Sequence, residues 1–126
     1  AASAIVMARE AQVPFNRLTL SSDGNGSQPK FDESGNLVGI GVAGFESLLE
    51  TLQQLVNRHQ LPLEEALLPF TQNVAAFLGL EHKGRIAPGC DADFLVLTDD
   101  LQIRDVWAKG RQIVREGAVC VKGTFE

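Results

Sequence analysis

The hydrophobic positions in the middle of the chain recur at the spacing of an α-helix. From Phe45 onward, apolar residues follow one another at intervals of three or four, which predicts one amphipathic helix ending near His59. This apolar stripe consists of Phe45, Leu48, Leu49, Leu52, Leu55 and Val56. A second, short helix is expected over residues 63–68, where Pro69 stops it because proline cannot continue a helix.

After residue 70 the pattern passes from helical to β. Thr71 occupies the N-cap position of a third expected helix, and Gly79 is expected to end it in the left-handed conformation. Pro88-Gly89 predicts a turn, and Lys109-Gly110 predicts a two-residue hairpin turn. Four short strands are expected, over residues 93–98, 106–108, 112–114 and 117–121.

The first third of the chain predicts one helix and one isolated strand. Residues 4–11 are expected to be helical up to Val13-Pro14, and residues 17–22 alternate as a short strand does. Residues 23–27 predict a turn, because glycine and asparagine tolerate positive φ, and residues 34–36 suggest the tip of a small hairpin. A single strand between helices has no sheet to join. We therefore expect this chain to be part of something larger.

Composition places the chain among globular domains and excludes several kinds of partner. Its 126 residues are 44% hydrophobic and 21% charged, which argues against a disordered tail. The net charge of −5 argues against a nucleic-acid partner or an anionic membrane surface. No apolar run approaches the roughly 20 residues of a membrane-spanning helix. Two cysteines are too few for a disulfide scaffold, so a reducing, cytoplasmic location is expected.

Asp23 is the first candidate for chemistry. It ends the predicted strand, whose neighbours on the same face are Thr19 and Ser21, and it enters a glycine-rich loop. In parallel α/β barrels the active site lies at the carboxyl ends of the strands, where a carboxylate can bind a metal ion or take a proton. The alternative, favoured by the pattern alone, is a plain turn. Asn25 and Ser27 likewise either bind a ligand's carboxylate or amide, or cap the loop.

The histidines and cysteines suggest no local metal centre. His59 lies at a helix end and His82 in a loop, and neither has a second histidine at metal-binding spacing. Cys90 and Cys120 lack a neighbouring base, so both are expected to be inert.

Three segments, taken in order, resemble the end of an amidohydrolase-superfamily barrel. They are LSSDG at residues 20–24, TQNVAAFLGL at residues 71–80 and GRIAPGCDADF at residues 84–94. The longer string SSDGNGSQPKFD, followed by VGIGVAGF, is similar to the isoaspartyl (β-aspartyl) dipeptidase branch of that superfamily. The resemblance covers essentially the whole chain.

The resemblance implies an α/β fold that is the C-terminal portion of a metal-dependent (β/α)8 TIM-type barrel plus strands of a small β-sandwich domain. Residues 1–82 would supply the last barrel strand and outer helices, and residues 83–126 the sandwich strands. Asp23 would stand at the end of the eighth barrel strand. The other metal ligands of the family, which are histidines and a carboxylated lysine, would precede residue 1.

The resemblance also implies an activity, which is hydrolysis of the isopeptide bond in β-aspartyl dipeptides. Two divalent cations, expected to be zinc, would polarise the scissile carbonyl and activate water. Asp23 would be both a metal ligand and the catalytic group that carries a proton to the leaving amine, and Ser27 would bind a terminal carboxylate of the dipeptide. The implied partners are a small-molecule dipeptide, the N-terminal part of the same enzyme and further copies in a homo-oligomer.

Two alternatives remain open. Another amidohydrolase of the dihydroorotase, hydantoinase or deacetylase type would share Asp23 but not the loop SSDGNGS. A protein made only of these residues would instead be a non-catalytic structural fragment, in which Trp107 on a β-hairpin would suit a subunit contact.

Overall fold

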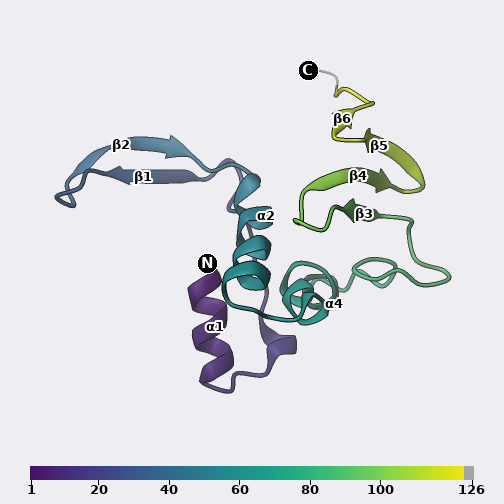
Figure 1. Ribbon diagram of the computed structural model, residues 1–126, viewed down its shortest axis with the longest axis horizontal. Helices are drawn as coiled ribbons and strands as arrows, with labels where there is room; N and C mark the ends of the chain where they lie inside the picture. The colour runs from purple at the N-terminus through teal and green to yellow at the C-terminus, as the bar shows by residue number, and fades with distance from the viewer. Residues whose placement is uncertain (124–126) are drawn as a thin grey trace. The chain divides into compact units, whose positions relative to one another are not determined.

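The computed structural model describes residues 1–123, which fall into two compact units (Figure 1). The first unit is Ala1–Asn73 and the second is Val74–Glu126. This division reflects compactness alone, so the expected boundary between barrel and sandwich portions after residue 82 stays a prediction.

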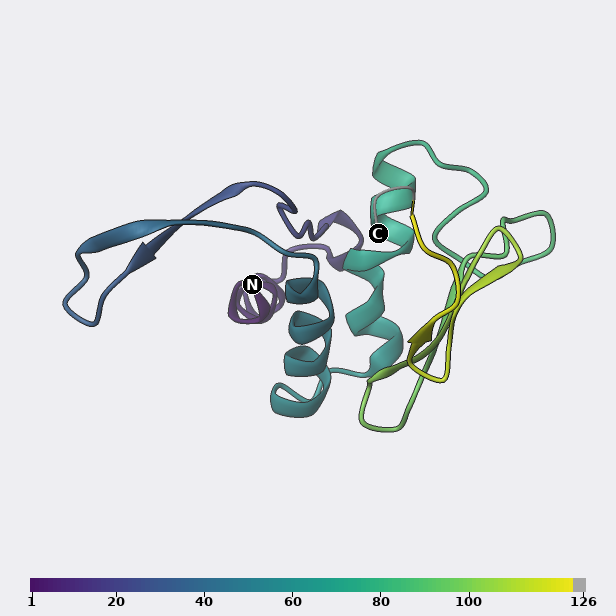
Figure 2. The same cartoon turned by 90° about the horizontal axis from the view of Figure 1, so that it is seen from above.

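The first unit is mainly helical. Its helices are α1 (Ala2–Glu10), the 3₁₀ turn η1 (Phe15–Arg17), α2 (Glu46–Gln53), the π-helical turn η2 (Gln54–Arg58), α3 (Leu63–Leu67) and the 3₁₀ turn η3 (Leu68–Phe70). Apolar side chains from α1, η2 and α3 form the core, as the burial of Ile5, Leu55 and Ala66 shows. Figures 1 and 2 show α1 and α2 side by side within this unit. The helices predicted over residues 4–11 and from Phe45 onward are confirmed.

The short helix predicted over residues 63–68 is confirmed, because α3 ends at Leu67, two residues before Pro69. Pro69 lies at the first turn of the 3₁₀ segment η3, where proline's missing N–H is not needed. Its side chain is fully buried.

The strand predicted over residues 17–22 is wrong for the described chain. Leu18 has an extended backbone (φ −89°, ψ 130°), but no strand lies beside residues 18–22 to form a ladder. Instead, the Leu20 N–H donates to the Pro69 carbonyl at 2.9 Å. The Asn73 side-chain amide donates to the carbonyls of Phe15 and Leu18, both at 2.8 Å. Residues 18–22 have no partner strand in the described chain, so their backbone is held by these hydrogen bonds to Pro69 of η3 and Asn73 of α4.

An antiparallel hairpin follows, formed by β1 (Ser27–Phe31) and β2 (Leu37–Val42). Its register pairs Ser27 with Val42. The tip turns at Gly35 (φ 82°), which confirms the expected turn at residues 34–36. The Asp32 carboxylate accepts hydrogen bonds from two backbone N–H groups of this tip, and the N–H of Asn36 is the main cause that lowers the pKa of Asp32. Figures 1 and 2 show the hairpin as a ribbon of two strands.

Helix α4 (Gln72–Phe77) spans the division between the units. Thr71 precedes it as predicted, but the Thr71 hydroxyl donates backward to the Leu67 carbonyl at 2.8 Å. Gly79 (φ 68°) ends the helical segment in the predicted left-handed conformation. Phe77, the last residue of α4, is exposed within the described chain.

The second unit contains a four-stranded antiparallel sheet. Its strands are β3 (Phe94–Leu97), β4 (Ile103–Ala108), β5 (Arg111–Arg115) and β6 (Ala118–Val119), and they are neighbours in chain order. Lys109 and Gly110 both have positive φ, 48° and 77°, which is the predicted two-residue hairpin turn. The Trp107 ring stacks on Phe94 with centroids 5.7 Å apart, so Trp107 is half-buried.

Within residues 1–123, no helix is both long enough and apolar enough to cross a lipid bilayer.

Candidate functional site

The loop around Asp23 is a tight turn with two non-glycine residues in the left-handed region. Asp23 has φ 51° and Asn25 has φ 65°. The Gly26 N–H donates to the Asp23 carbonyl at 2.8 Å and closes the turn. Aspartate and asparagine tolerate this conformation better than other residues with side chains. The predicted turn over residues 23–27 is therefore confirmed.

Two serine hydroxyls brace the start of this loop. The Ser21 hydroxyl accepts a hydrogen bond from the Asp23 N–H at 3.2 Å, and the Ser22 hydroxyl accepts one from the Gly24 N–H at 3.1 Å. The serines of the SSDG string thus bond the backbone that carries the candidate carboxylate.

The other end of the loop is joined to the base of the hairpin. The Asn25 N–H donates to the Ala43 carbonyl, and the Ala43 N–H donates to the Gly26 carbonyl, both at 2.9 Å. Ala43 is buried. Because β1 begins directly after Gly26, Ser27 is fixed relative to the turn by the hairpin register.

Both glycines of the loop are closely covered. A β-carbon built on Gly24 would lie 2.7 Å from Cζ and 2.8 Å from Cδ1 of the Phe45 ring. A β-carbon built on Gly26 would lie 2.6 Å from Oδ2 of Asp23. Real β-carbons essentially never come so close to another heavy atom. A larger residue at either position would therefore force its neighbour to move.

The predicted site residues come together at this junction of turn and strand. Asp23, Asn25 and Ser27 are all exposed. Within residues 1–123 the Asp23 carboxylate makes no hydrogen bond or ion pair, so its oxygens remain open to a cation or a proton. The structure does not test the roles predicted for Asp23 and Ser27, which stay predictions.

The donor set in this part of the chain fits one ligand position of a metal centre. No group of three or more histidine, cysteine, aspartate or glutamate side chains is gathered within residues 1–123. The free anionic carboxylate of Asp23 suits a divalent cation, but one carboxylate does not hold an ion by itself. Any further ligands therefore have to come from outside the described residues.

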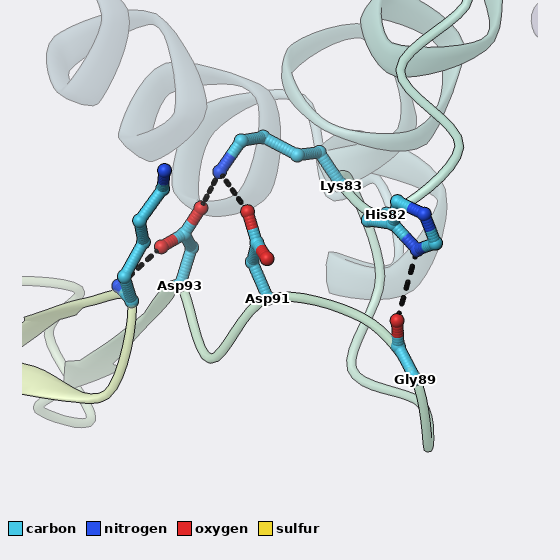
Figure 3. Close-up of polar contacts among 6 residues, drawn as sticks. His82, Lys83, Gly89, Asp91 and Asp93 are labelled. Carbon is cyan, nitrogen blue, oxygen red and sulfur yellow. Dashed lines mark hydrogen bonds and ion pairs between the residues drawn. The ribbon is translucent and has the colours of Figure 1, made fainter.

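The histidines play local roles. His82 lies in a loop, and its Nδ1 is 2.9 Å from the Gly89 carbonyl oxygen (Figure 3). The backbone N–H of His59 donates to the Gln54 carbonyl at the end of η2.

The sequence analysis missed a charged cluster in the second unit. The Lys83 ammonium donates to the carboxylates of both Asp91 and Asp93, at 2.8 Å for Asp91 (Figure 3). Asp93 also accepts the Lys109 backbone N–H at 2.6 Å, so the lysine and the hairpin turn share one carboxylate. In the sequence, only the two aspartates spaced two residues apart directly before β3 indicate that a basic side chain could bind there.

Each charge in this cluster shifts the pKa of the others. The hydrogen bond from Lys83 lowers the pKa of Asp91 and is also the main cause that lowers the pKa of Asp93. In return, the hydrogen bond to Asp91 is the main cause that raises the pKa of Lys83. The cluster connects the loop at residues 83–93 to the β4–β5 turn.

Comparisons with known proteins place the chain in a family of enzymes. The profile of the amidohydrolase family matches residues 4–113. The chain belongs to the amidohydrolase family. This confirms the resemblance stated from the sequence, and the α/β fold class expected for part of such an enzyme is confirmed as well.

Among solved structures, a β-aspartyl dipeptidase from Fervidobacterium islandicum AW-1, crystallised with a β-Asp-Leu dipeptide, is similar over 98% of this chain. The sequence identity is 35% and the TM-score is 0.82. An N-acetylglucosamine-6-phosphate deacetylase from Thermotoga maritima shares the fold over 92% of the chain, with 18% identity and a TM-score of 0.70.

Among curated proteins, an Escherichia coli allantoinase is 35% identical over 97 residues, which is 68% of this chain and 21% of the allantoinase. An adenine deaminase from Nitratidesulfovibrio vulgaris is 50% identical over 54 residues, or 40% of this chain and 9% of the deaminase. The chain also spans only 32% of the dipeptidase structure. It therefore corresponds to a minor part of each relative.

Proposed function

We propose that this chain is the C-terminal part of a metal-dependent hydrolase that cleaves the isopeptide bond of β-aspartyl dipeptides. The observation that carries the proposal is the 35% identity, maintained over 98% of the chain, to a β-aspartyl dipeptidase whose structure holds β-Asp-Leu. The proposal is also supported by the carboxylate of Asp23, which has no hydrogen-bond partner in the described chain and lies in the loop SSDGNGS that resembles the β-aspartyl dipeptidase branch.

In this proposal Asp23 has two roles. It is one ligand of a binuclear zinc centre whose other ligands lie outside residues 1–123, and it moves the proton between the attacking water and the leaving amine. When bound, the zinc ions would polarise the scissile carbonyl and make water more acidic. The turn supports both roles, because it holds an exposed carboxylate whose oxygens no other described group occupies.

Ser27 is the proposed contact for a terminal carboxylate of the dipeptide. Its hydroxyl is exposed, and its position is fixed by the pairing of Ser27 with Val42 at the hairpin base. A hydroxyl donor to a carboxylate is a charge-assisted hydrogen bond, which contributes more to binding than a neutral one.

Further expectations belong to the same proposal. The remaining part of the barrel, further copies in a homo-oligomer and a cytoplasmic location stay predictions. The enzyme would use a small molecule, with no nucleic-acid or membrane partner, in keeping with the net charge of −5.

A second candidate is hydrolysis of a cyclic amide. It is favoured by the similarity to the allantoinase. The sequence identity is 35% for both the allantoinase and the dipeptidase, but the allantoinase match covers 68% of this chain and the dipeptidase match 98%. Both reactions would use Asp23 in the same way. They differ in the substrate, and therefore in the predicted role of Ser27.

The experiment uses the complete polypeptide that contains this chain, purified and analysed for bound metal. Cleavage of β-Asp-Leu is measured by chromatography, beside cleavage of allantoin and dihydroorotate. We expect β-Asp-Leu to be the preferred substrate and a chelator to abolish its cleavage. Asp23→Asn should lower kcat by at least about 100-fold, because general acid–base catalysis contributes about that much. Preference for a cyclic amide, or near-normal turnover by the Asp23→Asn variant, would contradict the proposal.

A further inference from the structure

The ring of Phe45 lies directly on the backbone of the Asp23 loop, although Phe45 comes 21 positions after Gly24 in the sequence. Its Cζ and Cδ1 atoms occupy the space that a β-carbon on Gly24 would need. Phe45 is the residue immediately before α2, with φ −92° and ψ −12°. The start of this helix therefore fixes the position of the Phe45 backbone, from which the ring extends.

Within the described residues Phe45 is not part of the core of the first unit. It is 65% exposed there, whereas Leu52 and Leu55 are almost fully buried. Its ring lies against Gly24, which is the contact that joins Phe45 to the Asp23 loop.

The ring adds to the hydrogen bonds that hold the loop. Asp23 and Asn25 both adopt positive φ, which aspartate and asparagine tolerate better than other residues with side chains. The two serine hydroxyls that brace it make hydrogen bonds of 3.1–3.2 Å, and the bond to Asp23 is exposed to competing water. A ring over Gly24 limits movement of the peptide that links Gly24 to Asp23.

We propose that Phe45 is a positioning residue that holds the Asp23 carboxylate in place by packing on Gly24. The inference rests on the proposed function of Asp23, since metal ligation and proton transfer both require placement of the carboxylate to within a fraction of an ångström. Phe45 itself touches neither substrate nor metal in this scheme.

The test compares four variants of the complete polypeptide: Phe45→Ala, Phe45→Tyr, Gly24→Ala and the double variant Gly24→Ala/Phe45→Ala. Phe45→Ala should lower kcat about 10- to 100-fold with a smaller change in KM, because misplacement of a reacting group lowers turnover. Phe45→Tyr keeps the ring on Gly24 and should retain kcat within about threefold. Because both positions act through one contact, the double variant should lose no more activity than the worse single variant.

Phe31→Ala is the matched control, because Phe31 is 60% exposed and pairs with Leu37 at the end of β1 away from the Asp23 loop. It should keep normal turnover. The midpoint of thermal unfolding should be unchanged in Phe45→Ala. Normal turnover in Phe45→Ala would overturn the proposal, and so would losses that multiply in the double variant or that follow unfolding.

A second readout does not depend on the reaction. Hydrogen–deuterium exchange at the amides of residues 23–26 should be faster in Phe45→Ala than in the unchanged protein and the Phe31→Ala control. If the unchanged protein fails to cleave β-Asp-Leu but this exchange difference is present, the proposed function fails while the positioning contact stands. Equal exchange in all three proteins would overturn the positioning role.

Discussion

The carboxylate of Asp23 packs beside Gly26, on the side where a β-carbon would stand. A β-carbon at Gly26 would lie 2.6 Å from Oδ2 and 2.7 Å from Cγ of Asp23. The same two residues are joined by the hydrogen bond from the Gly26 N–H to the Asp23 carbonyl. Gly26 therefore closes the turn that carries Asp23 and leaves free the space beside the Asp23 carboxylate.

Gly26→Ala should displace Asp23. The added methyl group has no room unless the carboxylate of Asp23 moves and the turn shifts, because a β-carbon on Gly26 would also lie 2.8 Å from the backbone carbonyl oxygen of Asp23. Movement of a reacting group by about 1 Å can cost about 100-fold in rate. We expect kcat for β-Asp-Leu to fall about 10- to 100-fold, as measured in steady-state kinetics. Gly39→Ala is the control, because a β-carbon on Gly39 meets nothing within 4 Å. Equal kcat values for the two variants would show that the contact is unimportant.

Ser27→Ala should mainly weaken binding of the dipeptide. Loss of a hydrogen bond to a charged group corresponds to about 1.5–3 kcal/mol, so KM should rise about 10-fold or more while kcat changes little. Ser34→Ala at the hairpin tip, also exposed, is the control. An unchanged KM for Ser27→Ala would refute the contact between Ser27 and the substrate carboxylate.

Asn73→Ala should destabilise the first unit. The buried Asn73 amide donates to the carbonyls of Phe15 and Leu18, and without it these acceptors lose their partner. We expect the free energy of unfolding in urea to fall by about 1–3 kcal/mol. Gln72→Ala, at the exposed neighbouring position, should change it by less than about 0.5 kcal/mol. Equal stability of the two variants would contradict this role of Asn73.

The parts of the fold that local chemistry decides could be predicted from the sequence. The helical spacing from Phe45 onward correctly predicted a helix, and Gly79 and Gly110 correctly predicted a helix end and a hairpin turn. These features depend only on residues close in sequence. The strand predicted at residues 17–22 failed for the opposite reason. A strand depends on a neighbouring strand, and none lies beside it in the described chain.

The candidate site divides in the same way. The turn at Asp23 could be predicted, because the DGNG sequence favours positive φ at its own residues. The packing of Phe45 on Gly24 could not, because these residues are brought together by the hairpin between them. The ion pairs of Lys83 with Asp91 and Asp93 were also beyond prediction, since they depend on the course of an irregular loop.

The Lys83 cluster should make stability depend on pH in a specific direction. Lys83 lowers the pKa of Asp91 and Asp93 below the usual aspartate value, and the Lys109 N–H lowers that of Asp93 further. The folded state therefore binds fewer protons than the unfolded state near the aspartate range. The stabilisation from the two carboxylates is complete above about pH 4 and is lost as the pH falls through their depressed pKa values. The two aspartates in turn raise the pKa of Lys83. The stabilisation from the charge of Lys83 is therefore complete below about pH 10 and is lost as Lys83 deprotonates at higher pH.

Lys83→Met tests this directly. Urea unfolding of the chain and of the variant is measured between about pH 2 and pH 7, across the usual aspartate range. We expect the variant to be less stable at pH 7 and the difference to shrink as the pH falls below about 4, because Asp91 and Asp93 take up protons in the folded state as the pH passes through their depressed pKa values. Lys122→Met removes an exposed lysine of the same unit and should leave the curve of the unchanged chain intact. A stability difference for Lys83→Met that stays constant over this range would mean that Lys83 acts through packing of its aliphatic stem and not through its charge.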